Sequence, residues 1–231
     1  GNLFGDKVTE WEKGIEVSEA QVAQTEQDLQ RCKVGIDIEL DGNQEAAFAA
    51  LCHAYSQVAE SEMIWDMTTS QKIDRVKRRS SADQEVERKP VSFDRTSLEV
   101  VNCDYEALHL QNANGEDLYG FPLFIVMRDR NDLALIDLRD VELEYGSVAF
   151  TEEEKIPEDA ELIDYTWAKA NKDGSRDKRY SNNYQIPRMK YGLVYLRTQA
   201  GLNEAYLVSN ADALLAFASV LEDCQQVLAS A

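Results

Sequence analysis

The sequence predicts an α+β fold: an N-terminal antiparallel helical hairpin, then an antiparallel β barrel or roll that a C-terminal helix closes. Three observations carry this prediction. Apolar residues recur at helical spacing up to about residue 65, alternate as in strands from about Val91, and recur at helical spacing again after Ser209. Because strands and helices do not alternate along the chain, a parallel α/β sheet is disfavoured.

The chain is acidic: its 231 residues hold 24 Lys+Arg and 43 Asp+Glu, a net charge of −19. This charge disfavours nucleic acids and anionic membranes as general partners, because both are bound by cationic surfaces. The hydrophobic share of 44% is typical of a globular protein. No apolar run approaches the ~20 residues of a membrane span.

The N-terminus and the cysteines indicate the setting of the protein. The sequence begins with Gly1 instead of Met, so we expect either that the natural N-terminus was removed or that the sequence is a piece of a longer protein. The four cysteines are far apart and form no Cys-x-x-Cys pair. We therefore expect reduced thiols and a cytoplasmic location.

The first 36 residues predict a long amphipathic helix. Its apolar face repeats in steps of three and four residues, like the a and d positions of a coiled coil. These positions are Val8, Trp11, Ile15, Ser18, Val22, Thr25, Leu29, Cys32 and Ile36. Ser18 and Thr25 weaken the seam, so the helix needs a partner to be stable.

A second helix is expected after a turn at Asp41-Gly42, with Asn43 as its N-cap. Its apolar positions follow the same steps: Phe48, Leu51, Tyr55, Val58, Glu62 and Trp65. A short link between two amphipathic helices predicts an antiparallel hairpin. The hairpin is interpreted as a structural stalk, a self-association seam or a docking face for a partner helix.

Charge marks the expected domain boundary. Residues 1–70 hold four basic and 14 acidic side chains, whereas residues 71–90 hold seven basic and four acidic ones. The basic run Lys72–Arg79 lies in this switch and predicts either a solvated linker or an anion contact. We expect a helical hairpin with a basic linker over residues 1–80 and a β domain with a C-terminal helix over residues 81–231.

The middle of the chain predicts an antiparallel β unit. Its segments are rich in β-branched and aromatic residues, and turns such as Asn114-Gly115 and Asp173-Gly174 separate them. Pro122 lies inside an apolar run and indicates an edge or a bulge. The expected strands are Leu98–Cys103, Ala107–Gln111, Leu118–Met127, Leu133–Asp137, Val141–Tyr145, Leu162–Ala168, Tyr191–Arg197 and Ala205–Val208.

The chain ends in an amphipathic helix that Ser209 is expected to cap, with Asp212 reaching back to it. Its apolar stripe is Leu214, Phe217, Leu221, Cys224 and Leu228. An antiparallel β unit of about seven strands closed by such a helix resembles a pleckstrin-homology-like (PH-like) domain in outline. A generic α+β roll is the competing fold.

Several strings between Ser61 and Asn210 carry a second resemblance. They are Glu62–Asp66, Leu110–Gly115 with Asp117–Tyr119, Leu135–Arg139, Thr166–Lys169 with Asn171–Ser175, Asn182–Pro187 and Gly201–Glu204. In these strings the chain resembles a set of uncharacterised bacterial proteins with a helical hairpin followed by a PH-like β domain. The resemblance brings no catalytic residue with it.

Few motifs point to catalysis. The sequence has no phosphate-binding loop, nucleophile elbow or zinc-protease motif, and neither His53 nor His109 has a second ligand at metal spacing. A magnesium-dependent nuclease is an alternative, because Asp137 with Glu153 and Lys155 loosely fits its spacing. Such matches arise easily in an acidic chain, so we expect no catalytic residue, metal or cofactor.

The segment Lys169–Lys190 is the main candidate for a binding site. It holds seven basic and two acidic side chains in an otherwise acidic protein. Long polar loops are often functional, and basic residues interleaved with Tyr suit an anionic group. The candidate ligand-binding residues are Lys169, Lys172, Arg176, Lys178, Arg179, Tyr184 and Arg188. The competing interpretation is a loop that neutralises the protein's own acidic faces.

These features predict a non-enzymatic protein-interaction or scaffolding module of a larger bacterial protein. It is expected to bind a protein partner, or itself, through the helical hairpin. One alternative is binding of an anionic lipid or phosphate ligand through the basic loop. The other is a metal-dependent nuclease or hydrolase.

Overall fold

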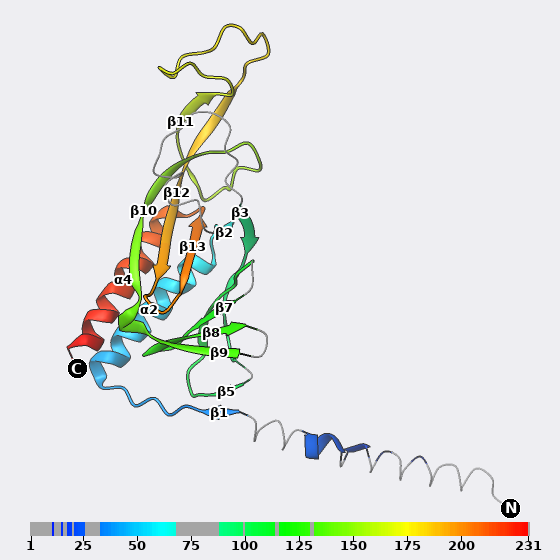
Figure 1. Cartoon of the computed structure of the whole chain (residues 1–231), viewed down its shortest axis with the longest axis vertical. Helices are drawn as coiled ribbons and strands as arrows, with labels where there is room; N and C mark the ends of the chain where they lie inside the picture. The colour runs from blue at the N-terminus through cyan, green and yellow to red at the C-terminus, as the bar shows by residue number, and fades with distance from the viewer. Residues whose placement is uncertain are drawn as a thin grey trace, which may run out of the picture. The chain divides into compact units, whose positions relative to one another are not determined.

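The computed structural model describes residues 11, 15, 18–19, 21–25, 33–67, 88–98, 100–113, 116–129 and 132–230. The chain divides into two compact units, residues 1–37 with 97–104 and residues 38–96 with 105–231. The basic run Lys72–Arg79, the turn Asn114-Gly115 and the expected boundary at residue 80 lie outside the described residues. Figure 1 shows the elements of each unit.

The first unit contains a helix and a short pair of strands. The described residues from Trp11 to Thr25 are helical. The expected continuation of this helix to Ile36 is wrong, because β1 (Val34–Gly35) is extended and pairs in parallel with β5 (Val101–Asn102). Pairing with a strand distant in the sequence overrides the helical period at this point.

The second unit begins with helix α2 (Gly42–Ala59). Its N-cap is Asp41 and not the expected Asn43. The Asp41 carboxylate accepts hydrogen bonds from the backbone NH groups of Asn43 and Gln44, and the Gln44 side chain accepts one from the backbone NH of Asp41. This capping box satisfies three backbone donors that the first helical turn leaves unpaired.

The end of α2 also differs from the expectation. The helix ends at Ala59, and the residues that fitted its period farther on form strand β2 (Ile64–Met67). Trp65 therefore lies on a strand, where it is buried, and not on a helix. A four-residue apolar run fits both periods, and pairing partners decide between them.

The larger sheet is antiparallel, with the strand order β10-β12-β13-β2-β3, and β11 pairs with β12 beyond the end of β13. Its further strands are β3 (Arg88–Val91), β10 (Glu142–Thr151), β11 (Glu161–Trp167), β12 (Gln185–Arg197) and β13 (Asn203–Val208). Strand β3 lies within the expected β domain but was not among the expected strands, and β10 and β12 are longer than expected.

The second sheet is also antiparallel, with the order β4-β6-β7-β8-β9. Its strands are β4 (Phe93–Thr96), β6 (Ala107–Leu110), β7 (Asp117–Gly120), β8 (Phe124–Asp129) and β9 (Asp132–Asp137). The apolar run around Pro122 is two strands and not one, and Pro122 lies in the turn between them, where it needs no ladder hydrogen bond. A 3-10 helix, η1 (Leu138–Asp140), leads from this sheet into β10.

Helix α4 (Ala211–Ala229) packs against α2, β10 and β12. Its predicted stripe is confirmed, since Leu214, Phe217, Leu221, Cys224 and Leu228 are all buried. The N-cap is Asn210 and not Ser209; the Asn210 side chain accepts a 3.0 Å hydrogen bond from the backbone NH of Ala213. The Ser209 hydroxyl donates instead to the carbonyl of Met63, which ties α4 to β2.

One apolar core lies between the helices and the inner faces of both sheets, with Tyr55, Leu118, Tyr206 and Leu214 fully buried within it. The fold is therefore α+β with mostly antiparallel sheets and a C-terminal helix, as predicted. The described strands do not close into a barrel, and the PH-like outline is not confirmed. The helical hairpin is not confirmed either, because the buried face of α2 packs against α4. Among the described helices, none combines the length and the apolar character needed to cross a membrane.

Candidate functional site

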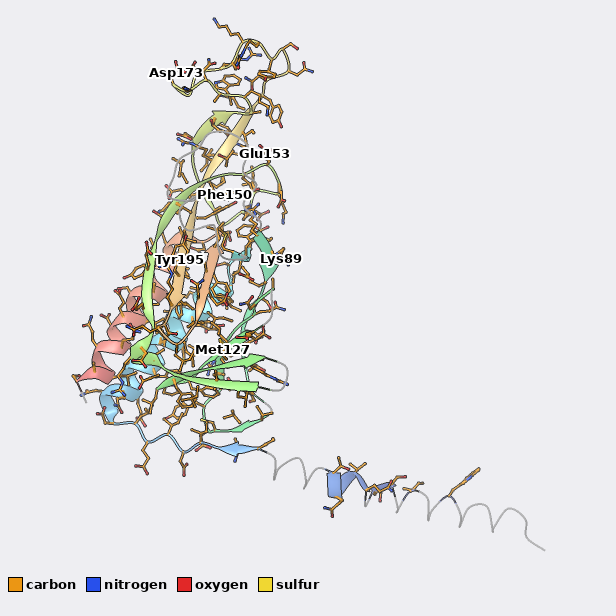
Figure 2. The ribbon with its side chains drawn as sticks, viewed as in Figure 1. Lys89, Met127, Phe150, Glu153, Asp173 and Tyr195 are labelled. Atoms are coloured by element: carbon orange, nitrogen blue, oxygen red, sulfur yellow. The ribbon has the colours of Figure 1, made fainter. Side chains whose placement is uncertain are left out.

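The predicted basic loop lies at the end of the hairpin formed by β11 and β12. We call residues 161–190 the distal hairpin: β11, the loop of residues 168–184 and the outer half of β12. Figure 1 shows it extending beyond the ends of α2 and α4, and Figure 2 shows Asp173 at its far end and Tyr195 within the sheet. The loop therefore projects from the second unit and does not lie flat on its sheet.

Hydrogen bonds within the loop hold its shape. The expected Asp173-Gly174 turn is confirmed, with Gly174 at a φ of +82°, and it lies inside the bridge between Ala170 and Arg176. Asn183 is buried, and its side chain bonds to both backbone groups of Lys169 at 2.9 and 2.6 Å. A buried amide that satisfies the backbone in this way has a structural role.

Several of the predicted ligand-binding cations are paired within the protein. Arg179 donates to both carboxylate oxygens of Asp177, from 2.6 to 3.1 Å, and these hydrogen bonds lower the pKa of the Asp177 carboxyl. Arg188 forms an ion pair with Asp164, the cross-strand partner on β11. Arg176 stands over the ring of Trp167 at 5.3 Å and donates to the carbonyl of Ser181.

The remaining cations differ from one another. Lys169 is exposed and has an interaction partner. Lys172 and Lys178 are exposed and have no ion-pair partner among the residues that the structure describes. Lys190, at the base of the hairpin, contacts Glu161 at 3.0 Å and Asp212 at 2.9 Å. Part of the segment's positive charge is thus balanced by carboxylates, whereas Lys172, Lys178 and Arg176 have no carboxylate partner among the described residues.

An open pocket of about 410 Å³ lies beside the loop. Its lining brings together three predicted ligand-binding residues, Lys169, Arg179 and Tyr184, and excludes Lys172, Arg176, Lys178 and Arg188. The acidic residue Glu153 also lines it. Since Arg179 is already bound to Asp177, the pocket offers mixed charge and not a concentrated positive field.

The residues of the nuclease alternative do not form a metal site. Asp137 caps η1 and binds Arg139, whereas Lys155 binds Glu62 at 2.5 Å. Asp137 and Glu153 lie beyond opposite ends of the ten-residue strand β10, a length of about 30 Å at the usual rise per residue. The described part of the chain contains no group of three or more His, Cys, Asp or Glu side chains placed to hold a metal ion.

The apolar surface of the distal hairpin was not predicted from the sequence. On β11, Leu162, Ile163 and Tyr165 are 45%, 47% and 56% exposed. In the loop, Tyr180 and Tyr184 are also exposed, the latter by 61%. The strand has a register shift between Leu162 and Asp164, so its apolar side chains do not all face one side. A signal was present, because Leu162 and Ile163 are adjacent and break the alternation of a half-buried strand.

A buried ionic cluster was missed as well, at the place where the distal hairpin joins the sheet. Arg88 on β3 donates to Glu152 at 2.8 and 2.9 Å, and the hydroxyl of Tyr191 donates to the same carboxylate at 2.7 Å. The Arg88 guanidinium lies 4.2 Å from the ring centre of Trp65 and 4.5 Å from that of Phe150. Burial and the bond to Glu152 raise the pKa of Tyr191. Trp65, Glu152 and Tyr191 are buried, and the Arg88 side chain is 8% exposed and also pairs with the exposed Glu154, so the cluster anchors the hairpin to β3.

Comparison of the chain with family models, with curated proteins and with solved structures gave no match.

Proposed function

We propose that this chain is a non-enzymatic protein-interaction module and that the distal hairpin is its contact surface. The observation that carries the proposal is the exposure of Leu162, Ile163 and Tyr165 on a strand that lies at the edge of its sheet. Exposed edge strands with apolar side chains are aggregation-prone unless a partner covers them. Clustered exposed apolar side chains mark interaction sites for the same reason.

The chemistry of the surface indicates an extended segment as the partner. Within the described part of the chain, β11 pairs with β12 alone, so its other edge presents backbone NH and carbonyl groups to an added strand. Apolar side chains of that strand would cover Ile163 and Tyr165. The exposed ammonium groups of Lys172 and Lys178 favour acidic residues beside the loop.

Site-specific photocrosslinking tests the proposal. A photoreactive residue is placed at Tyr165 in the whole chain, and a matched one at Leu135, an equally exposed apolar position on β9 of the other sheet. We expect one defined partner to crosslink at position 165 and not at position 135. The identified partner is then purified and its binding measured directly, because crosslinking from an extract is not sufficient. Equal crosslinking at both positions would contradict a specific surface.

A second candidate function is binding of an anionic lipid or phosphate ligand by the loop. The pocket lined by Lys169, Arg179 and Tyr184 supports it. The pairing of Arg179 with Asp177, and the presence of Glu153 in the pocket, favour the protein-interaction function over it. Flotation with phosphoinositide-containing vesicles separates the two functions. If the loop binds lipid, the wild-type chain floats with the vesicles, whereas the double charge-reversal variant of Lys169 and Lys178 does not.

A further inference from the structure

Within the part of the chain that the structure describes, β11 has one free edge, and Pro187 fixes its hydrogen-bonding phase. In antiparallel strands, opposed residues alternate between pairs that exchange hydrogen bonds and pairs whose backbone groups point away from each other. Tyr165 lies opposite Pro187, which has no backbone NH, and the Pro187 carbonyl accepts a 3.0 Å hydrogen bond from Glu152 on the other side of β12. The NH and carbonyl groups of Tyr165 therefore point outward to the free edge of β11, and those of Trp167, two residues on, do the same.

Exposed apolar side chains accompany these outward-pointing backbone groups. Leu162, Ile163 and Tyr165 lie on β11 itself, and Ile156 lies in the segment that leads into the strand. A strand that is added to a sheet edge gains affinity from main-chain hydrogen bonds and specificity from side-chain contacts. The edge of β11 offers both, so its occupant is an extended strand with apolar side chains of its own.

The base of the distal hairpin, where β11 begins, is acidic. The carboxylates there outnumber the ammonium groups that pair with them, since Lys155 forms an ion pair with one carboxylate and Lys190 with two. Hydrogen bonds and ion pairs of side chains or backbone connect the acidic residues of this base, which are Glu62, Glu158, Asp159, Glu161 and Asp212. The base therefore keeps an excess of negative charge.

The far end of the distal hairpin has the opposite charge. Lys172, Arg176 and Lys178 have no carboxylate partner among the described residues, and the carboxylate of Asp177 is already bound to Arg179. The exposed apolar side chains of β11 lie between this basic end and the acidic base. The hairpin thus carries an apolar centre flanked by charges of opposite sign.

A second copy of β11 is the occupant that fits this edge. It is an extended strand with exposed apolar side chains and outward-pointing backbone groups. In an antiparallel pair the basic end of each hairpin lies beside the acidic base of the other, so the charges attract at both ends. In a parallel pair like charges would meet at both ends. Because the hairpin extends beyond the ends of α2 and α4, an antiparallel pair keeps the helices of the two copies apart (Figure 1).

We infer that two copies of this chain associate through the free edges of their β11 strands, as an antiparallel pair about a two-fold axis near Tyr165. The outward-pointing backbone groups of Tyr165 and Trp167 form the hydrogen bonds between the copies, and Ile163 and Tyr165 lose solvent contact. Because both copies use the same edge, the contact is closed at two subunits. This assignment rests on the proposed function, since it names a second copy as the partner of the same surface.

Sedimentation equilibrium of the whole chain in reducing buffer tests the association. We expect a concentration-dependent mass that approaches twice the 26.1 kDa of one chain. The tip variant, Lys172→Glu with Lys178→Glu, should weaken dimerisation by about tenfold or more, because acidic ends then meet acidic bases. Arg95→Glu with Arg139→Glu makes the same change in net charge at exposed positions outside the hairpin and should leave the dimer intact. Unchanged near-ultraviolet circular dichroism shows that the variants stay folded.

Mixing of two variants tests the antiparallel arrangement. The base variant, Glu158→Lys with Glu161→Lys, should lose self-association as the tip variant does. An equimolar mixture of the tip and base variants should form a heterodimer about as stable as the wild-type dimer, because opposite charges again meet at both ends. In a parallel pair the tip variant alone would associate as the wild type does, since like charges meet in both.

A monomer at all concentrations, a dimer that the tip and base variants leave unchanged, equal weakening by the control variant, or a mixture that stays monomeric would overturn the self-association. Failure of the proposed function gives a different result. If a monomeric chain crosslinks another protein at position 165 and not at position 135, the distal hairpin remains a contact surface and only its pairing with a second copy is wrong.

Discussion

Strand β12 runs through two different environments. In its inner half, from Tyr191 to Leu196, every residue except Gly192 has its side chain buried on one face of the sheet or the other. In its outer half it supports β11, whose side chains Leu162, Ile163 and Tyr165 remain largely exposed. The burial of the inner half is thus explained by folding, whereas the three exposed apolar side chains of β11 contribute little to the core. This difference is the physical reason to look for function at the hairpin.

The same contrast holds for the ion pairs of the two regions. Arg88 and Glu152 are buried, and their side chains are 8% and 1% exposed. Arg188 and Asp164, on the distal hairpin, are 41% and 45% exposed. Removal of one partner from a buried pair leaves an uncompensated charge in the interior, whereas water replaces the lost partner at the surface.

The largest expected effect is that of Arg88→Ala. The change leaves the buried Glu152 carboxylate without its cation and opens space between Trp65 and Phe150. We expect the free energy of unfolding to fall by about 3–5 kcal/mol. Arg188→Ala, its matched control on the distal hairpin, should have a much smaller effect. Urea denaturation of both variants measures the difference, and equal losses would remove the contrast.

A smaller loss is expected from Gly192→Ala. The added Cβ would lie 2.8 and 2.9 Å from side-chain atoms of Leu214 and 3.1 Å from the Cα of Ala211. The helix must shift away from β12, at a cost of about 1–3 kcal/mol. Gly146→Ala on the neighbouring strand is the control, because nothing lies within 4 Å of a Cβ there. Thermal unfolding that ranks the two variants equally would contradict the close packing of α4 on β12.

The third prediction concerns a carboxyl on the inner part of the sheet. Burial, and then the negative charge of Asp66, raise the pKa of Glu204 from 4.5 to about 7, although a hydrogen bond from Asn112 opposes the shift. The folded protein therefore holds a proton that the unfolded chain releases, so stability falls as the pH rises from about 4.5 to about 7.

Glu204→Gln removes this titration. The variant should match the wild type near pH 4.5 and exceed it above pH 7 by roughly 1–2 kcal/mol, a value reduced for the partial solvent contact of the side chain. Denaturation of both proteins across this pH range measures the gap. A gap that is constant with pH would show that the carboxyl titrates normally.

The smallest expected effect on stability is at the distal hairpin itself. Ile163→Ser with Tyr165→Ser should change the free energy of unfolding by no more than about 0.5 kcal/mol per site, because both side chains are exposed. Differential scanning calorimetry measures it. A loss comparable to that of Arg88→Ala would assign these residues to the fold and remove the reason to regard them as a contact surface.

How far the sequence predicted this structure depended on the range of the interactions involved. The stripe of α4 from Leu214 to Leu228 was predicted because helical spacing is a local property. Strands β2 and β3 were missed because their pairing depends on residues far away in the chain: Trp65 lies opposite Leu207 on one side and Pro90 on the other. The predicted N-caps of α2 and α4 were wrong by two residues and one residue, since Asp, Asn and Ser are nearly interchangeable at the N-cap position.

For the candidate site, too, local features were predicted from the sequence and long-range contacts were not. The basic loop and its Asp173-Gly174 turn were predicted, because composition and turn chemistry are local. Pairing of the loop's cations with the protein's own acidic groups was the competing interpretation, but the particular partners were not predicted, since the partner of Arg188 depends on the register between β11 and β12. Nor could the sequence show that Ile163 and Tyr165 are exposed, because burial is decided by which strands and helices cover a face.

The most direct test of the contact surface is the affinity of the purified partner, identified by crosslinking at position 165, for two matched double variants. Ile163→Ser with Tyr165→Ser changes the distal hairpin, and Leu133→Ser with Leu135→Ser changes equally exposed apolar side chains on β9. Calorimetric titration should show a loss of about tenfold or more for the hairpin variant and no change for the β9 variant. An unchanged affinity of the hairpin variant, or an equal loss in both, would contradict the assignment of the distal hairpin as the contact surface.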